Sequence, residues 1–558
     1  MGSWSPWPFT RHVLVVSLVL GAVAGATRPL HGQGIVASRG WQEATVGSEL
    51  ETYLRVLQLA GETPLYPWSI RGFSPRELDR LAPRDSLHPW ADRLPAPASD
   101  SSRGLRLALL RPDARLIYNS SFAWAHTDGV VWAGRGLTGA VEGGVQARWG
   151  PLSVTLDPIV FWAQNAAFAL QPNGLQGPQS FGNGISPSTI DLPQRFGAAP
   201  YRRLDAGQSS VRLDAFGLAL GVSTAGQIWG PGISQPLVLG NAGPGFLHFF
   251  FGSSSPVNLW IGHLHGRLEI GRLEQSPYSP MPTDSGTRLM SGIVATLVPR
   301  WTPGLELGFT RFYHQLWQGW HVGDFLIPLQ SLFLTQLNSS KKYDPTSPDY
   351  TPQNQISSVF ARWAFPASGF EVFGEFVRDD RSRDLRDLLN EPDHESGFML
   401  GFMKVVRRRD GSLVVLRGEL ANGRVTELAQ VRPQVPLYVH TPLLAGHTNL
   451  GIVLGSPLAA QGGVGSTLGV DLYRPDGRWT AELTRDSRPE PAQPGGVAGG
   501  RLDVPNALRV ERLLFRQGWD FTAAATAVFE LNRNFAGDAF NLRLDVGARV
   551  ALNRGGGR

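Results

Sequence analysis

The sequence contains no cysteine, and it contains no long apolar run beyond its N-terminus. Without cysteine the chain forms neither disulfides nor thiolate metal sites, which suits a protein that crosses an oxidising periplasm without covalent staples. A helix that spans a bilayer needs about 18 or more consecutive apolar residues, so a helical membrane protein is excluded. The 51 basic and 46 acidic residues nearly balance, and a net charge of +5 does not indicate a nucleic-acid partner.

Recognisable catalytic motifs are also absent. The chain has no Gly-x-Ser-x-Gly elbow, no His-Glu-x-x-His pair and no Gly-rich phosphate loop. We therefore expect no catalytic residues and no cofactor, and an outer-membrane hydrolase is the least favoured class. His263 and His265 share one strand face, but no third ligand is nearby, so a structural role is favoured over a metal site.

Residues 1–33 have the pattern of a secretory signal peptide. Arg11 and His12 precede the apolar core Val13–Ala24, and Ala24-Gly25-Ala26 offers a cleavage site, with a second candidate after Gln33. A membrane anchor is the alternative, but the apolar core is too short for one. We expect export and cleavage.

Residues 34–103 are predicted to form a small periplasmic helical segment. Ser48-Glu-Leu-Glu51 is a capping box before a helix over Leu50–Ala60, which Gly61 ends. A second helix starts at Ser74-Pro75, and Ser86–Leu94 can add a short third one. Helices this short bury little surface alone, so they must dock on a larger body. Residues 95–102 have the composition of a linker.

The C-terminal stretch Phe540–Leu552 predicts a membrane-spanning strand. Apolar residues occupy every second position, and Arg543, Asp545 and Arg549 lie on the opposite face. The strand is long enough to cross a bilayer at a tilt. We expect its apolar face to contact lipid and these three charged residues to line a lumen. The terminal aromatic residue usual in such barrels is missing.

The same alternation recurs between tight turns. These turns are expected near Gly150, Phe216, His265, Trp301, Ala367, Asp410, Asp476 and Gln517. Long segments separate the hairpins, approximately at 164–208, 229–256, 276–286, 316–353, 380–394, 423–462 and 487–505. Eight hairpins, a first strand near 114–125 and the final strand give about eighteen antiparallel strands over residues 104–558. Short turns that alternate with long loops are typical of an outer-membrane β-barrel in a Gram-negative-type bacterium.

Aromatic residues support this fold class. Several lie near the tight turns, among them Trp149, Phe216, Trp301 and Trp519. Such rings favour the headgroup zone and form a girdle at the end of a transmembrane barrel. A large soluble all-β protein is the alternative, but it would not sort its connections by length in this way. Outer-membrane lipid is therefore an expected partner, and we expect a monomer.

The stretch Tyr313–His321 is a candidate sugar-binding loop. Tyr313, Trp317 and Trp320 offer aromatic faces on which sugar rings can stack, and His321 offers a hydrogen-bonding group beside them. The alternative, favoured slightly, is that Trp317 and Trp320 belong to the outer aromatic girdle or pack the loop.

One further motif carries a family resemblance. Trp229-Gly230-Pro231-Gly232 precedes Leu237-Val-Leu239 and the pair Asn241-Ala242. With the helix over Leu50–Ala60 and the segment Pro67-Trp68-Ser69, this resembles the Wzi family of capsule assembly proteins. In that family the order of the Trp and Pro residues is reversed relative to Pro67-Trp68.

The resemblance implies a helical bundle beside an eighteen-stranded barrel that holds capsular or related polysaccharide at the cell surface without catalysis. It makes Trp229 and Asn241 candidate glycan contacts, with Gly230, Pro231 and Gly232 shaping the loop. The residues alone also allow Trp229 to pack the loop into the barrel mouth. The rival function is a porin-like channel, because a lumen lined by Arg543, Asp545 and Arg549 could conduct if it were open.

Overall fold

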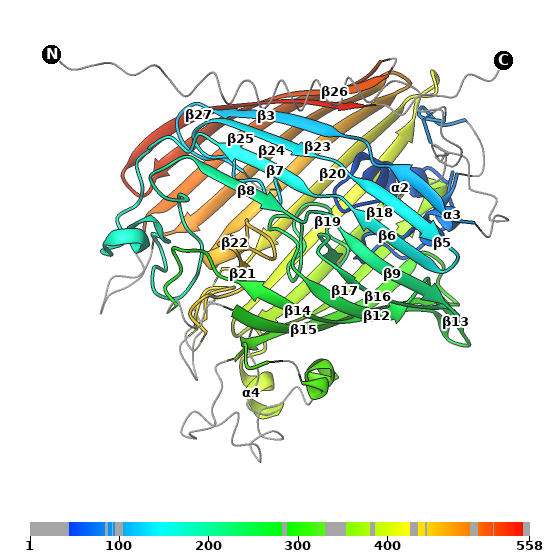
Figure 1. Ribbon diagram of the computed structural model, residues 1–558, viewed down its shortest axis with the longest axis horizontal. Helices are drawn as coiled ribbons and strands as arrows, with labels where there is room; N and C mark the ends of the chain where they lie inside the picture. Colours follow the sequence, from blue (N-terminus) through cyan, green and yellow to red (C-terminus); the bar gives the residue numbers. More distant parts are fainter. Residues whose placement is uncertain are drawn as a thin grey trace.

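The fold is given by a computed structural model (Figure 1). It describes residues 44–83, 87–91, 93–94, 104–125, 127–281, 287–319, 321–329, 353–379, 385–424, 434–440, 443–490, 500–516 and 518–550. The expected signal peptide, the expected linker and Trp320 lie outside these ranges.

Most of the described strands form one closed antiparallel barrel (Figure 1), while β1 with β11 and β21 with β22 form two small sheets of their own. Its segments are β2 Arg106–Leu109, β3 Asp113–Asn119, β4 Gly136–Glu142, β5 Val145–Trp149, β6 Leu152–Leu156, β7 Ile159–Ala163, β8 Tyr201–Asp205, β9 Ser210–Ala215, β10 Leu218–Ser223, β12 His248–Ser253, β13 Val257–Leu259, β14 Gly262–Glu274, β15 Thr287–Pro299, β16 Leu305–Leu316, β17 Gln353–Phe365, β18 Phe370–Asp379, β19 Ser396–Arg407, β20 Leu413–Asn422, β23 Val464–Arg474, β24 Gly477–Pro489, β25 Leu502–Arg516, β26 Trp519–Arg533 and β27 Gly537–Val550.

Ten of these segments are halves of five interrupted strands. The pairs are β2/β3, β4/β5, β6/β7, β8/β9 and β12/β13, and both halves of each pair hydrogen-bond to the same neighbouring strand. Pro112 and Pro158 interrupt two of them, because proline has no N–H to donate to the ladder. With each pair counted once, the described residues form eighteen strands, as the sequence predicts.

Eight short turns lie at one end of the barrel. The other end carries the long connections and one short turn, residues 534–536 between β26 and β27. Seven of the eight expected turn positions match, but the turn placed near His265 is wrong. His265 lies inside β14, and the chain turns at Trp260-Ile261 between β13 and β14. The expected long segments 164–208 and 229–256 contain β8 and β12, because both strands are short and break the alternation.

The barrel closes where β27 pairs with β3, from Arg543 opposite Asn119 to Arg549 opposite Asp113. Asn541 fixes the upper end of this seam. Its Oδ1 accepts hydrogen bonds from the backbone N–H of Ser121 and Phe122, and its Nδ2 donates to Oδ1 of Asn119 at 2.9 Å. Residues 551–558, which include the last two positions of the expected strand, lie outside the described residues.

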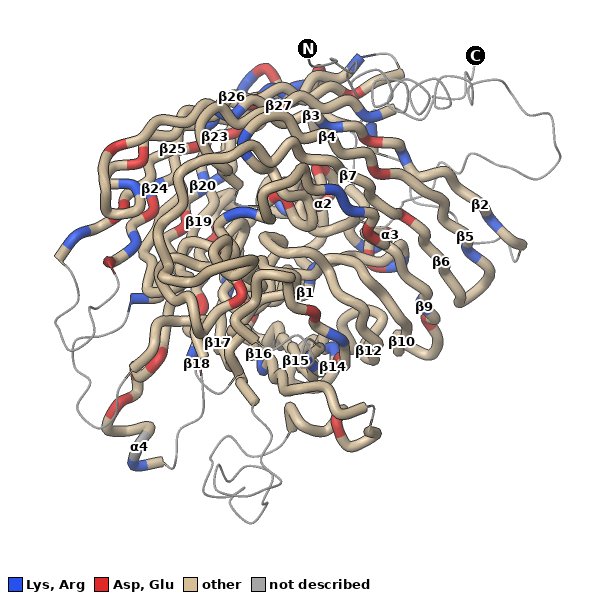
Figure 2. Tube along the Cα trace, turned by 60° about the vertical axis from the view of Figure 1, so that its left-hand side comes forward, with Lys and Arg blue, Asp and Glu red and all other residues tan. Residues whose placement is uncertain are grey.

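The N-terminal helices lie inside the short-turn end of the barrel (Figure 2). Helix α2 spans Glu49–Leu59, and the Oγ of Ser48 accepts from the N–H of Glu51. Helix α3 spans Pro75–Leu81 and has the full capping box of Ser74 and Glu77. Strand β1, Ile70–Arg71, pairs with β11, Ile228–Trp229, which belongs to the long connection after β10.

An apolar core occupies one side of the lumen. The connections 224–247 and 434–463 enter the barrel from the long-loop end and meet β1, as their buried apolar residues form one cluster with the wall. The wall contributes Met290, Val294, Phe312, Ile356, Phe360, Phe373, Val377, Met399 and Ala421. We refer to residues 44–94 and these two connections, where described, as the plug.

Short elements complete the long connections. They are η1 Gly177–Phe181, η3 Val322–Leu329, α4 Leu385–Asn390, β21 Thr448–Asn449, β22 Ile452–Val453 and η7 Ala460–Gly462, while η6 Pro366–Ser368 lies in a short turn. Across the described ranges, every helix falls short of the length and apolar character that a transmembrane helix requires.

Candidate functional site

The Trp-Gly-Pro-Gly segment lies at the centre of the plug. Trp229 is fully buried and packs against Phe312, with ring centroids 6.0 Å apart. A Cβ on Gly292 would lie only 2.6 Å from the Trp229 ring, so the wall has room for the indole because residue 292 is glycine. A glycan cannot stack on Trp229 in this position. The burial favours the packing role over direct contact with polysaccharide.

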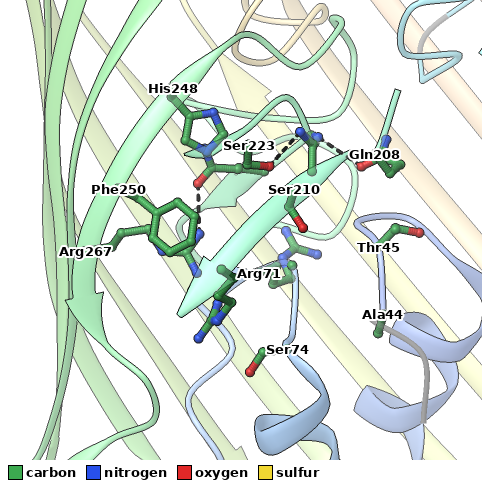
Figure 3. Close-up of a pocket in the computed structure, with 15 residues that line it drawn as sticks. Ala44, Thr45, Arg71, Ser74, Gln208, Ser210, Ser223, His248, Phe250 and Arg267 are labelled. Atoms are coloured by element: carbon green, nitrogen blue, oxygen red, sulfur yellow. Dashed lines mark hydrogen bonds between the residues drawn. The ribbon is translucent and has the colours of Figure 1, made fainter. Parts of the chain in front are cut away.

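Gln227 attaches this segment to the barrel wall beside a small cavity that His248 and Arg267 also line (Figure 3). Its Nε2 donates to Glu269 at 2.8 Å and lies 3.0 Å from Nε2 of His248. Its Oε1 accepts from Arg267 at 3.1 Å and from Nε1 of Trp229 at 3.3 Å. The adjacent cavity has a volume of only about 50 Å³. It separates the plug from the wall and is too small for a sugar ring.

The three residues after Trp229 contact charged groups of the plug and the wall. Gly230 has φ +99°, and a Cβ there would lie 3.0 Å from the carboxylate of Glu375. The carbonyl of Pro231 accepts from Arg55 at 2.9 Å, and the carbonyl of Gly232 accepts from Arg71. These residues therefore shape and anchor the loop inside the barrel.

Buried glutamates on the wall receive backbone N–H groups of the plug. Glu306 accepts from Trp68 at 2.9 Å and from Ser69 at 3.0 Å. Glu375 accepts from Leu237 at 2.9 Å, and Glu419 accepts from Ile233 and Ser234. A carboxylate buried away from water needs such donors, so each one ties a plug segment to the wall. The sequence places Glu371 and Glu375 on the polar face of their strand, but it does not reveal that protein fills the lumen there.

The connection 434–463 is held by His447 and Arg288. Nε2 of His447 lies 2.6 Å from the carbonyl of Val238, so the neutral ring donates its Nε2–H. Arg288 donates to the carbonyls of Gly446 at 2.8 Å and Thr448 at 2.6 Å. Burial, reinforced by the charge of Arg288, lowers the pKa of His447 to about 4.

This shift predicts that the connection detaches on acidification. Between about pH 6.5 and pH 4 the free ring binds a proton and the docked ring does not, so docking weakens as the pH falls, by about 3 kcal/mol at most. Amide hydrogen-exchange protection factors of residues 443–456 should be constant above pH 7 and decrease towards pH 4. The variant His447→Gln keeps an N–H donor and cannot titrate, so its profile should be flatter. Equal protection of the wild type at pH 4.5 and pH 7.5 would contradict the prediction.

A charged chamber of about 440 Å³ lies on the other side of the lumen. Its wall is formed by β20, β23–β27 and β3, and the plug faces it with the start of α2 and residues 233–241. Basic and acidic side chains pair along the wall. Arg417 bonds to Glu482 at 2.7 Å, and Arg478 bonds to Glu511 at 2.7 Å. Arg509 bonds to Asp545 at 3.0 Å.

The three charged residues of the final strand line this chamber. Arg543 bonds to Asp545 at 2.6 Å and reaches Asp128 of the connection after β3 at 2.8 Å. Arg549, nearer the short turns, bonds to Asp113 at 2.7 Å. Two polar residues that line the chamber, Asn241 of the plug and Arg115 of β3, lack some of the partners that the other charged groups have. Oδ1 of Asn241 has no hydrogen-bond partner, and Arg115 has no ion pair, within the part of the chain that the structure describes.

The residues of the aromatic stretch are dispersed. Tyr313 lies within β16 and is buried, and Trp317 follows the end of that strand and is half-buried. His321 is exposed at the long-loop end, and its N–H donates to Asp324 at 3.1 Å. Of the members that the structure describes, Trp317 and His321 are therefore the accessible ones. Of the histidine pair, His265 contacts Ser253 and Glu77, while His263 is exposed.

The geometry defines an outer-membrane type of β-barrel whose lumen holds a protein plug. Neither a protein-family model nor a curated protein matches the sequence. Among solved structures, the chain is similar to Wzi from Escherichia coli, described as an outer-membrane protein involved in group 1 capsule assembly and a carbohydrate-binding β-barrel. The match covers 92% of this chain and 100% of that one, with TM-score 0.60 and 15% identity. The chain therefore has a Wzi-like fold.

More distant similarity extends to two other barrels. OccK5 of Pseudomonas aeruginosa matches 79% of this chain and 97% of its own length, with 11% identity and TM-score 0.38. OccAB4 of Acinetobacter baumannii gives the same coverages with 11% identity and TM-score 0.37.

Proposed function

We propose that this protein resides in the outer membrane and binds capsular or related surface polysaccharide without catalysis, helping to assemble or retain a capsule. The observation that carries the proposal is the Wzi-like fold, shared along the full length of a barrel described as carbohydrate-binding. Binding would take place at the long-loop end, which faces the cell exterior in this orientation. Trp317 and His321 remain candidate contacts, and the contact would be reversible.

The plug supports a binding role over an open channel. Its apolar core joins 224–247, 434–463 and the walls of β15–β20, so that buried apolar side chains fill that side of the lumen. Three buried glutamates hold it in place, as described above. A porin does not need a lumen core of this kind, whereas a protein that presents rigid outer loops benefits from one.

The test is retention of surface polysaccharide by cells that lack this protein and carry a plasmid-borne copy. We expect the wild-type gene to restore retention and the Trp317→Ala/His321→Ala variant to reduce it several-fold. Trp149→Ala is the matched control, because this exposed tryptophan lies at the short-turn end. Full retention by the double variant would exclude these contacts. Full retention by the deletion strain itself would refute the function.

A second candidate function is slow ion conduction through the charged chamber. The chamber is lined by Glu49 and Arg549 near the short turns and by Asp128 near the long loops. Planar-bilayer recording of the purified protein distinguishes the two functions. A steady pore that is unaffected by deletion of residues 34–100 would favour the channel, and a closed wild type that opens on this deletion would favour the plugged binding protein.

A further inference from the structure

Strand β16 carries polar residues on its outward face. Alternate residues from Glu306 to Phe312 point into the lumen and contact the plug, so Leu305, Leu307, Phe309, Arg311 and Tyr313 point outward. Leu307 and Phe309 are exposed, as lipid-facing residues should be. The next outward residue, Arg311, is buried to 3% exposure. Something other than lipid therefore covers the wall at this height.

Arg311 lies at the depth of the membrane interior. It is the fourth outward position above the short turn that contains Trp301. Three steps of about 7 Å along a strand tilted by about 40° place it about 15 Å above that turn, within an apolar band about 25 Å tall. On β26, on another part of the wall, the outward positions at this height are alanines. An arginine here requires both hydrogen-bond partners and a cover.

The cover is η3, in the connection after β16. Arg311 donates from Nη1 to the carbonyl of Pro328 at 3.0 Å, and from Nε and Nη2 to Oε1 of Gln355 at 3.0 and 2.8 Å. The hydroxyl of Ser291, also outward, donates to the carbonyl of Asp324 at 2.7 Å. The ring of Phe325 meets Phe249 of β12 edge to face, with centroids 5.5 Å apart. The element thus lies flat against the outside of the barrel.

The opposite side of η3 is apolar and exposed. Val322, Leu326 and Leu329 are 89%, 57% and 62% exposed, whereas Ile327 is buried against the wall. Element η3 lies on β14, β15 and β16. Phe309 of β16 and Phe251 of β12 are exposed on the same outer wall, so the apolar surface of η3 extends an apolar band instead of interrupting it. An isolated exposed apolar residue needs no explanation, but three on one short element at this depth do.

We propose that η3 lies in the hydrocarbon region of the outer leaflet, with Val322, Leu326 and Leu329 in contact with lipid acyl chains. In this arrangement η3 covers the polar outward residues Ser291 and Arg311. The side of η3 that faces away from the wall then presents an apolar surface to the lipid. The connection after β16 then combines two roles. Trp317 and His321 remain at the rim, and the segment that follows them returns into the membrane and anchors the loop there.

The absence of cysteine makes the test direct. Val322→Cys, Leu326→Cys and Leu329→Cys are each labelled with a nitroxide in the full protein, reconstituted into phospholipid vesicles. Phe309→Cys is the lipid-facing control and Asp410→Cys, in an exposed short turn, is the aqueous control. Folding of each variant is checked by its heat-modifiable migration on a gel.

We expect the three labels to resemble Phe309→Cys, with high collision rates with oxygen and several-fold lower rates with a water-soluble nickel chelate than Asp410→Cys. Labels that behave like the aqueous control would overturn the proposal. Spin–spin broadening that disappears on dilution with unlabelled protein would identify a second copy of this chain as the occupant, which also overturns it. The three labels are measured in separate variants, so if one variant fails to fold, the other two still test the proposal.

Discussion

Substitution of Glu371 by glutamine is expected to destabilise the attachment of the plug by about 3–5 kcal/mol. It leaves the buried Arg55 without its carboxylate partner and leaves the buried Arg362 with only Glu306, at 3.7 Å. Glu371 is fully buried at the base of β18. Its carboxylate accepts from Nε of Arg55 at 2.8 Å and lies 2.6 Å from Nη2 of Arg362. Arg362 also bonds to Gln58, so this cluster joins α2 to the wall.

Glutamine has nearly the shape of glutamate, so the effect should come from charge and not from a cavity. Burial already lowers the pKa of Arg55, and the loss of Glu371 removes the largest opposing influence. We expect faster protease cleavage within residues 44–94 and a lower midpoint in urea, with the barrel strands retained by circular dichroism. Glu274→Gln is the control, since that half-exposed carboxylate contacts an equally exposed arginine and should contribute less than about 1 kcal/mol. Equal cleavage of the two variants would show that the cluster does not hold the helix.

Replacement of Trp229 by alanine is the second large effect, at about 3–5 kcal/mol for a fully buried tryptophan. The indole fills the space above Gly292 and packs on Phe312, and its Nε1–H donates to Gln227. Its removal leaves a cavity in the plug core and takes away one of the two hydrogen bonds that Oε1 of Gln227 accepts, so that only the bond from Arg267 remains.

Hydrogen exchange of residues 228–239 measures this loss directly, and planar-bilayer recording should show openings that the wild type lacks. Trp301→Ala is the matched control, because that side chain is exposed at the short-turn end and fills no core position. Protection factors that match those of the wild type would mean that the Trp229 pocket collapses without cost, and the packing role would then be refuted.

The barrel could be predicted from sequence because its main signal is local. Alternation along single strands and the lengths of the connections indicate the number of strands without knowledge of which strands meet. The helix over 49–59 was likewise visible from Ser48 and the periodic leucines that follow it. Errors arose where a strand was short or interrupted, as at β8 and at the turn misplaced to His265.

The plug and the covered wall could not be predicted in this way. Alternation separates two faces of a strand, but Glu371 looks the same whether its side chain meets water or a buried arginine. The stretch from Thr310 to His314 obscures the pattern further, because protein covers both faces there. The sequence therefore predicts Tyr313 in a loop, and this prediction is wrong because the residue lies in β16. Such contacts join residues far apart in the chain, as Arg55 and Glu371 show.

The seam between β27 and β3 imposes an order on biogenesis. The hydrogen bond from Asn541 to Asn119 joins residues 422 positions apart, so the ring cannot close until nearly the whole chain has been translated and delivered. Helix α2 precedes every wall strand in the chain, yet its partners lie on strands from β17 to β24. The N-terminal segment must therefore remain undocked until the middle of the wall has formed, and an assembly factor that inserts this barrel has to accommodate that helix within a still-open sheet.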